Sequence, residues 1–478
     1  MAKGHHQLGR LALTLGAVLL ALLGLVVAAL LTFRIPQNAA GMAAKGVCSA
    51  AFVAGRPWQS LMAEDVLPAS PVLHAIDLTV DESAHSVTAR FAGVFTRRAV
   101  LREGRGCVLD LEPDPQAQVT VRPAVADTAW PLGDAALPVS EWGPGVDASR
   151  LQQVVDAAFV GAGDPQAGNA RAMAVVHQGH LLVLREAAGF TGGVPLHGWS
   201  MTKTITGMLS HKRAAEVGLS LDTPVVDAFP AGREPGWLAA WRGDARKDIT
   251  VADLLYMRDG LTTTENYQPW GAVPQMLWGS SNVAAWAADH PAEAAPGTRW
   301  RYLSATANLL AAVDRGQFAS DAEYWSYPAR ALFNPIGAHT AVLETDTAGN
   351  WVGSSYLWAS VGDWARLGLL MLQDGRWAGS QVLPPGWLAR AGTASTAQGE
   401  GRGYGGMSWL LGQPEAGTCK DNPGVPPDTV AMIGHWGQIV AMVPSREAVV
   451  LRLGWTFKRA QFDNCKFLAD VLSALPNK

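Results

Sequence analysis

The chain has 478 residues, of which 49% are hydrophobic and 16% are charged, and its formal net charge is −4. This length and composition predict a globular protein with more than one folded part, because the chain is too long for one small core and too apolar for disorder. The slightly acidic balance offers no extended positive surface to a phosphate backbone, and we therefore exclude nucleic acid as a partner.

An uncharged apolar run, residues 11–33, follows Lys3 and Arg10. At about 1.5 Å per residue it is long enough to cross a hydrocarbon layer of about 30 Å. A cleaved signal peptide is the alternative, but the run is longer than the usual apolar part of such a peptide and no clear cleavage site closes it. The preceding basic residues favour a cytoplasmic segment 1–10. We expect a single-pass anchor in the cell (inner) membrane, with the rest of the chain extracytoplasmic, or periplasmic.

Four cysteines, none in a Cys-x-x-Cys pair, fit this compartment: Cys48, Cys107, Cys419 and Cys465. An even number of cysteines outside a reducing compartment predicts two disulfides, for which three connectivities exist. The pairs Cys48–Cys107 and Cys419–Cys465 are the simplest, because each then lies within one region of the chain. No His or acidic residue lies at zinc-ligand spacing around these positions, so we expect no metal site there.

Residues 34–127 predict a small β-rich accessory domain. Segments 74–81 and 86–93 alternate apolar and polar residues, as half-buried strands do, and 106–111 is a candidate third strand. A linker rich in Pro, Ala and Gly, residues 128–145, separates this part from the remainder of the chain.

In the remainder of the chain, residues 146–478, we expect strands at both ends and helices between them. Segment 147–159 begins with a capping Asp147 and carries a helical apolar stripe. Strand pairs are expected over 171–190 and, far downstream, over 429–456. This order predicts one antiparallel sheet closed by both ends of the domain, flanked by helices and with a helical insert, an α/β (α+β) architecture.

The helix that begins at Ser200 carries the only Ser-x-x-Lys in the chain, Ser200 and Lys203. Residues three apart on a helix share one side, so the amine can take the proton of the serine hydroxyl if burial lowers its pKa. The positive end of the helix dipole would also favour an oxyanion at Ser200. By itself the motif is weak, because a solvated surface pair accounts for most random instances.

Two further motifs follow downstream. Tyr302 and Ser304 lie two residues apart in an extended step before a predicted helix, so both side chains point the same way. His435, Trp436 and Gly437 are expected at the start of a strand, where the glycine lets a ligand approach the backbone. Taken singly, Ser304 could be a helix cap, Tyr302 a packing aromatic and His435 a structural histidine.

Ser-x-x-Lys, Tyr-x-Ser and His-x-Gly in this order resemble the active-site set of the serine β-lactamase and penicillin-binding-protein superfamily. The resemblance runs from about Val146 to the C-terminus. Within the superfamily the chain is most similar to class C-like serine hydrolases and esterases, and among these to 6-aminohexanoate-dimer hydrolases. The residues that carry this finer resemblance are Tyr302-Leu303-Ser304, the Gln after Gly437, and the stretch 264–269.

The resemblance implies a β-lactamase-like fold and a role for each matching residue. Ser200 would be the acylated nucleophile, Lys203 its proton acceptor, and Tyr302 a group that shares acid and base work. The N–H groups of Ser200 and Gln438 would form the oxyanion hole. The implied substrate-binding residues are Ser304, Tyr267, His435, Trp436 and Gly437.

Two departures bear on the substrate. The third motif is His-Trp-Gly where β-lactamases and transpeptidases have Lys-Thr-Gly, so a permanent cation for a β-lactam carboxylate is missing. Asp259 stands where such stretches usually have a small hydroxyl residue. We therefore expect a membrane-anchored serine hydrolase that cleaves a small ester or amide through an acyl-enzyme, with no metal and no cofactor. A penicillin-binding protein, DD-peptidase or β-lactamase is one alternative, and a catalytically inactive binding or sensor module is the other.

Overall fold

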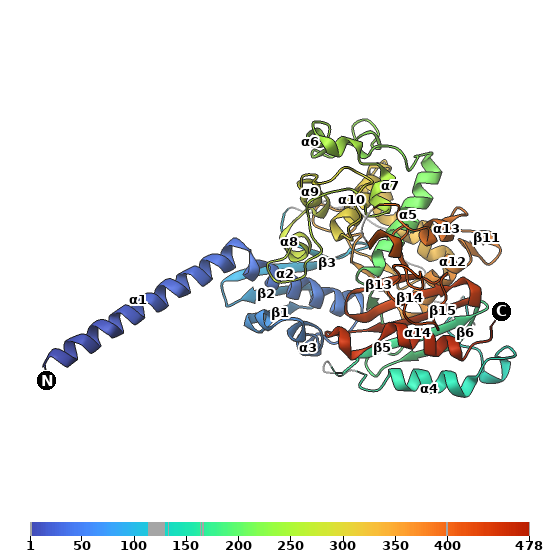
Figure 1. Cartoon of the computed structure of the whole chain (residues 1–478), viewed down its shortest axis with the longest axis horizontal. Coiled ribbons are helices and arrows are strands. Elements are labelled where there is room, and N and C mark those ends of the chain that lie inside the picture. Colours follow the sequence, from blue (N-terminus) through green and yellow to red (C-terminus); the bar gives the residue numbers. More distant parts are fainter. Residues whose placement is uncertain are drawn as a thin grey trace.

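The computed structural model of the protein describes residues 2–112, 130–131, 133–162, 164, 167–397 and 400–477. The predicted boundary between accessory domain and linker, at residues 127/128, lies outside the described residues. Two sheets organise the described part of the chain, a six-stranded sheet and a four-stranded sheet (Figure 1). We refer to residues 35–112, which carry the smaller sheet, as the N-terminal unit.

The six-stranded sheet is antiparallel and joins both ends of the larger part of the chain, as predicted. Its strands, in spatial order, are β12 (Trp409–Leu410), β13 (Val430–Gly434), β14 (Gln438–Val443), β15 (Ala448–Gly454), β5 (Ala170–His177) and β6 (His180–Glu186). The expected hairpin turn at Gln178-Gly179 is present, with both residues at positive φ. Because β15 pairs with β5, the last strands of the chain complete the sheet that the first strands begin.

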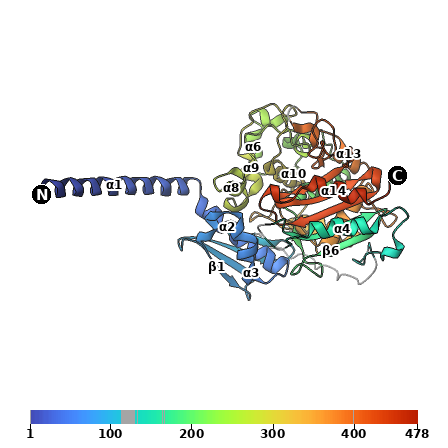
Figure 2. The same ribbon diagram turned by 60° about the horizontal axis from the view of Figure 1, so that its bottom comes forward.

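Helices cover both faces of this sheet (Figure 2). On one face α12 (Val361–Leu372) contacts β14, β15 and β5, and α5 (Met201–Val217) contacts β13. On the other face α4 (Ala148–Ala158) and α14 (Asn464–Ser473) pack together over the sheet through one apolar cluster. Asp147 caps α4, as expected, because its side chain accepts a hydrogen bond from the Arg150 backbone N–H at 2.9 Å.

The predicted helical insert lies between β6 and β13. Its other helices are α6 (Leu238–Trp241), α7 (Val251–Leu255), α8 (Ala272–Gly279), α9 (Val283–Ala288), α10 (Ser304–Gly316), α11 (Asp321–Pro328) and α13 (Trp387–Gly392). The insert region also holds short strands: β7 (Leu196–His197), β8 (Val342–Leu343), β9 (Leu357–Ala359), β10 (Arg376–Trp377) and β11 (Ser380–Gln381).

The N-terminal unit is a meander of four strands crossed by a helix. The unit consists of α2 (Ile35–Cys48), α3 (Trp58–Leu61), β1 (Ile76–Asp81), β2 (Ser86–Phe91), β3 (Phe95–Arg102) and β4 (Gly106–Leu109). The sequence predicted β1, β2 and β4, but not β3. Small residues on one face of α2, Ala40, Ala43 and Ala44, are fully buried against β2 and β3, which lets the helix lie close to the sheet.

Buried polar contacts join the N-terminal unit to the larger part. Lys45 of α2 forms an ion pair with Glu344, which also accepts hydrogen bonds from the Ser49 hydroxyl and the Cys107 backbone N–H. Asp65 pairs with Arg171 of β5. These side chains are shielded from solvent, so separating the two parts would expose unpaired charges.

Both disulfides of the preferred pairing are present, Cys48–Cys107 and Cys419–Cys465. The first links α2 to β4 inside the N-terminal unit. The second links the loop after β12 to α14.

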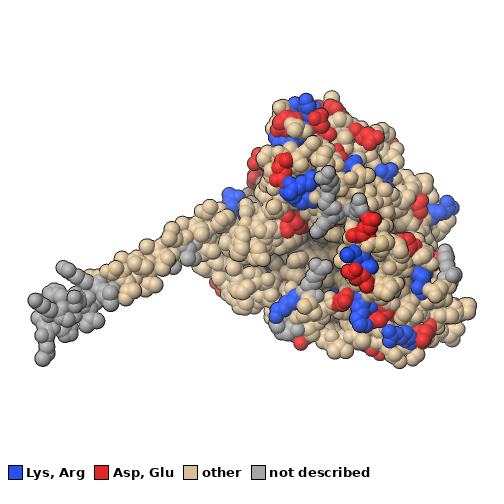
Figure 3. All heavy atoms as spheres, in the orientation of Figure 1, with Lys and Arg blue, Asp and Glu red and all other residues tan. Residues whose placement is uncertain are grey.

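Helix α1 (Ala2–Thr32) projects away from the rest of the molecule (Figures 1 and 3). Its segment Leu13–Thr32 is the one helical stretch within the described residues that is long and apolar enough to cross a membrane. It carries no Lys, Arg, Asp or Glu, and it contributes nothing to either core. The length and composition of the segment fit a membrane span and a signal sequence equally well.

Candidate active site

The nucleophile candidate Ser200 stands at the start of α5, as predicted. The turn before it is tight, because Trp199 has a φ of 49° and a Cβ on Gly198 would lie 2.2 Å from the Trp364 ring. Apolar residues of α5, such as Ile205, are fully buried and fix the helix in the core. The helix ends at Gly218, which adopts the left-handed conformation expected of a C-terminal cap.

Lys203 lies directly beneath Ser200. Its Nζ donates to the Ser200 Oγ at 2.8 Å, to the Ser304 Oγ at 3.0 Å and to the Ser354 carbonyl oxygen at 3.2 Å. The side chain is 1% exposed, and burial lowers the pKa of the Lys203 amine to about 8, while nearby Glu265 opposes the shift. An amine with this pKa is partly neutral near pH 8, so it can accept the hydroxyl proton of Ser200.

Tyr302 and Ser304 face the same lysine, so the structure brings three of the sequence motif residues together. The Lys203 Nζ lies 4.7 Å from the centre of the Tyr302 ring. Burial, and then the charge of Glu265, raise the pKa of the Tyr302 phenol above its usual value, while Ser200 acts in the opposite direction. The phenol therefore stays protonated at neutral pH.

The third motif lies in a turn, which differs from the predicted start of a strand. His435, Trp436 and Gly437 connect β13 to β14, and the last two residues have φ values of 60° and 86°. The turn follows Gly434, whose Cα approaches the Gly198 carbonyl so closely that a Cβ there would lie 2.2 Å from the oxygen. This contact brings the turn to the start of α5, which the strand pattern alone did not reveal.

Aromatic rings close the site above Ser200. The rings of Tyr267 and His435 stack with centres 4.4 Å apart, and Trp199 meets Trp436 edge to face at 5.1 Å. Burial, helped by the charge of Lys203, lowers the pKa of His435 to about 4. The imidazole is therefore neutral at physiological pH and supplies no cation to the site.

Gln438, the first residue of β14, fixes the shape of this turn. Its side-chain Oε1 accepts from the Gly454 N–H at 2.9 Å, and its Nε2 donates to carbonyl oxygens that include that of His435 at 3.2 Å. The side chain is thus used for structure, and the backbone N–H is the group that the resemblance assigns to the oxyanion hole.

Glu265 belongs to the site and was not singled out in the sequence. Its carboxylate accepts hydrogen bonds from the Ser304 backbone N–H at 2.6 Å and from the Ser304 hydroxyl at 2.7 Å. One of its oxygens lies 3.9 Å from the Lys203 Nζ. Its only sequence signal was its position in the stretch that also contains Tyr267, because a loop residue leaves no periodic pattern.

The structure also accounts for Asp259, which had no explanation at the level of the sequence. Its side chain is buried and accepts hydrogen bonds from the Leu261 N–H at 2.9 Å and the Thr306 hydroxyl at 2.5 Å. Burial raises the pKa of this carboxyl. Asp259 therefore ties the loop after α7 to α10, the helix that begins with Ser304.

An antiparallel sheet flanked by helices, with a serine at the first turn of a buried helix, defines the class of serine hydrolases with the β-lactamase fold. The chain belongs to the β-lactamase family, whose sequence profile matches residues 155–467. No protein of curated function matches the sequence.

Solved structures share the fold at low sequence identity. A Bacillus anthracis protein named as a 6-aminohexanoate-dimer hydrolase has 20% identity and a TM-score of 0.52, and the match covers 64% of this chain and 81% of that one. A Bacteroides dorei protein named as a β-lactamase has 16% identity and a TM-score of 0.53, and the match covers 69% of this chain and 99% of that one. EstCE1, described as a hydrolase with promiscuous acyltransferase activity, has 16% identity and a TM-score of 0.51, with 68% and 97% covered.

Proposed function

We propose that the protein is a membrane-anchored, extracytoplasmic hydrolase that cleaves a small ester or amide through an acyl-enzyme on Ser200. The observation that carries this proposal is the 2.8 Å contact between the Ser200 Oγ and a fully buried Lys203 amine with a lowered pKa. A binding module has no need of a desolvated amine against a hydroxyl, whereas an activated nucleophile requires it.

The reaction begins when neutral Lys203 takes the hydroxyl proton and the Ser200 Oγ attacks the substrate carbonyl carbon. The tetrahedral intermediate collapses as the C–O or C–N bond breaks, and the leaving alcohol or amine takes up a proton. The Tyr302 phenol is protonated at neutral pH and the centre of its ring lies 4.7 Å from the Lys203 Nζ, so it is placed to pass a proton to the leaving group, which Lys203 then replaces. Water attacks the acyl-enzyme by the same route and releases the acid.

The negative charge on the intermediate would be held by the N–H groups of Ser200 and Gln438. Ser200 lies at the positive end of a 17-residue helix, whose dipole favours an anion there. The hydrogen bonds of the Gln438 side chain to Gly454 hold the second N–H donor in place.

The anchor and the compartment belong to the same proposal. Residues 11–33 would form the single membrane span, residues 34–127 the accessory domain, and residues 146–478 the catalytic domain. Two disulfides support an extracytoplasmic location, because such bonds persist outside the reducing cytosol.

The environment of His435 weighs against the penicillin-binding alternative. A β-lactam or a peptide stem presents a carboxylate that a cation of the third motif would bind. His435 occupies that motif and is held neutral by burial and by Lys203. An ester or amide without such a carboxylate is the better match.

The test is to treat the full-length protein in detergent with a fluorophosphonate and, separately, with a fluorescent penicillin. We expect the phosphonate to label Ser200, and Ser200→Ala to lower ester hydrolysis by at least about a thousandfold while the fold is retained. Ser220→Ala, an exposed serine just beyond the same helix, is the matched control and should behave as the wild type. Labelling by both probes would favour the penicillin-binding alternative, and labelling by neither would favour the inactive module.

A further inference from the structure

A cavity of about 390 Å³ adjoins the proposed active site and has walls from both parts of the molecule. Trp199, Tyr267, His435 and Trp436 line it on the side of Ser200. The opposite wall consists of residues of the N-terminal unit, from α2 and from the segment 69–73. Its volume lies within the range of cavities that bind small ligands.

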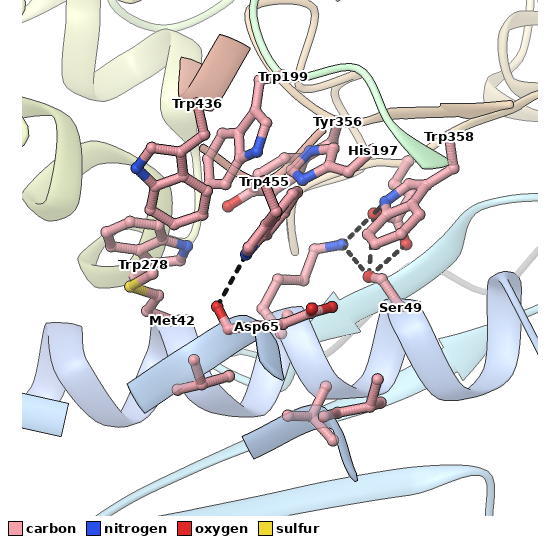
Figure 4. Close-up of a pocket in the computed structure, with 16 residues that line it drawn as sticks. Met42, Ser49, Asp65, His197, Trp199, Trp278, Tyr356, Trp358, Trp436 and Trp455 are labelled. Carbon is pink, nitrogen blue, oxygen red and sulfur yellow. Dashed lines mark hydrogen bonds and ion pairs between the residues drawn. The ribbon is translucent and has the colours of Figure 1, made fainter. Parts of the chain in front are cut away.

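The wall contributed by the N-terminal unit is apolar. It includes Ile35, Ala39 and Met42 of α2, together with Val72 and Leu73. Figure 4, a view of the neighbouring pocket, shows Met42 pointing from α2 toward the indoles of Trp278 and Trp436. A space of this size between aliphatic side chains and indole rings suits a hydrocarbon chain.

Two polar side chains interrupt this wall, Asn38 and Ser70, and the Ser70 hydroxyl accepts a hydrogen bond from the Val72 backbone N–H. Asn38 of α2 is 2% exposed, and neither its amide nitrogen nor its amide oxygen has a hydrogen-bond partner among the described residues. A buried amide without partners is rare, because its lost hydration is not replaced. The Asn38 Oδ1 lies beside Gly279, and the amide has both donor and acceptor atoms, so a rotation of the side chain toward the cavity would let it bind an ester, amide or hydroxyl group that enters with the chain.

The same wall lies next to the candidate membrane span. Ile35 follows the end of the span, Thr32, by three residues, and Met42 lies on the second turn of α2. A turn at residues 33–34, where Arg34 has a φ of 53°, joins α1 to α2. Three residues extend at most about 11 Å, and the headgroup layer on each side of the hydrocarbon is about 5 to 8 Å thick. The cavity wall therefore begins at or beside the level of the lipid headgroups.

We infer that this cavity binds the acyl chain of an amphiphilic ester or amide that resides in the membrane, and that the N-terminal unit exists to form its outer wall. The inference rests on the proposed function, because it names the substrate class of that same site. The chain lies along α2, Asn38 binds a polar group beside the chain, and the carbonyl carbon reaches the Ser200 Oγ.

The experiment uses the full-length protein in nanodiscs and nitrophenyl esters of acetate, octanoate and dodecanoate. Relative to the ester free in water, each methylene that enters the cavity should raise kcat/KM about fourfold until the cavity is full. Ala69→Phe, which fills the cavity from its partly exposed rim, should lower kcat/KM for octanoate and dodecanoate by a larger factor than for acetate and so abolish the preference for the long chains. Ala84→Phe, the same substitution on an exposed turn of the N-terminal unit, is the matched control and should keep the preference.

A second arm separates a bilayer source of the chain from an aqueous one. A fluorogenic dodecanoate ester is placed either in the same nanodisc as the protein or in protein-free vesicles. Faster turnover in the shared nanodisc supports the inference, and equal rates overturn delivery from the bilayer. Acetate hydrolysis without a chain-length preference, or a preference that survives Ala69→Phe, overturns the cavity assignment and leaves the proposed function intact. If the wild-type protein hydrolyses none of the esters and is not labelled by the fluorophosphonate, both the cavity assignment and the proposed function are overturned.

Discussion

The amine of Lys203 controls the pH dependence expected of the reaction. Burial lowers its pKa to about 8, so the folded protein holds this group as a protonated amine below that pH and as a free base above it. Only the free base can take the proton of Ser200, and kcat/KM for a neutral ester should therefore rise with pH to a plateau, with a midpoint near pH 8. A stopped-flow pH profile measures this. A midpoint at or above the ordinary lysine pKa would contradict the assignment of Lys203 as the base.

Glu265 is expected to set the position of that midpoint. Its carboxylate favours the protonated form of Lys203, so Glu265→Gln should lower the lysine pKa further and move the rising limb of the profile to lower pH. The direction distinguishes an electrostatic role from a merely structural one, which would reduce the rate at every pH. Glu234→Gln, at an exposed position of the insert, serves as the matched control and should leave the profile unchanged.

The residues of the site differ in how far the sequence could predict them. Ser200 and Lys203 are three apart on one helix, so their contact is local and the spacing alone predicts it. The approach of Ser304 to Lys203 depends on packing between α5 and α10 and was not predicted, because the resemblance implied only a substrate-binding role for Ser304. Glu265 reaches the site from a loop, and no spacing rule connects a loop carboxylate to a serine 39 positions downstream.

At the scale of elements, regular strands were predicted and closely packed turns were not. The alternation of apolar and polar residues at 74–81 and 86–93 predicts β1 and β2. The strand pairs at 171–190 and 429–456 were also predicted, and there β5 and β15 are buried along their whole length, as strands covered on both faces are. The motif at 435–437 was expected in a strand, but close contact between Gly434 and Gly198 and the positive φ of Trp436 make it a turn. Such contacts depend on residues more than 200 positions apart.

The contact of α2 with the larger part makes a specific stability prediction. Glu344 is fully buried and neutralises Lys45, whose pKa burial itself lowers. Glu344→Ala leaves a buried amine without its counter-ion and should lower the free energy of unfolding by about 3–5 kcal/mol. Replacing both partners with apolar residues, as in Lys45→Met with Glu344→Leu, should recover only part of this loss, because the Ser49 hydroxyl, the Cys107 N–H and the Trp358 indole N–H still lose their acceptor. Denaturant unfolding measures both, and Glu103→Ala, on an exposed turn, is the control.

At the scale of the whole molecule, the proposed acyl-chain cavity would make the N-terminal unit part of the substrate-binding site. No catalytic motif was predicted in this unit, because the residues with which it lines the cavity are mostly aliphatic or small. In three dimensions its helix α2 lies between the candidate membrane span and the aromatic residues beside Ser200. Residues form such a wall because of where they lie in the folded protein, and a pattern along the sequence does not reveal this.

The two disulfides allow the compartment and the architecture to be tested together. They close loops with sequence separations of 59 and 46 residues, and the chain-entropy argument gives each a stabilisation of about 4 kcal/mol. Reduction should therefore lower the melting temperature, and alkylation of intact cells before reduction should modify no cysteine.

The double variant Cys48→Ser with Cys107→Ser separates the effects of the two disulfides. Because that disulfide connects α2 to β4, its loss should weaken long-chain ester turnover more than acetate turnover, whereas Cys419→Ser with Cys465→Ser should lower stability without changing the preference. Four thiols that are alkylated without reductant would contradict both the disulfides and the extracytoplasmic location.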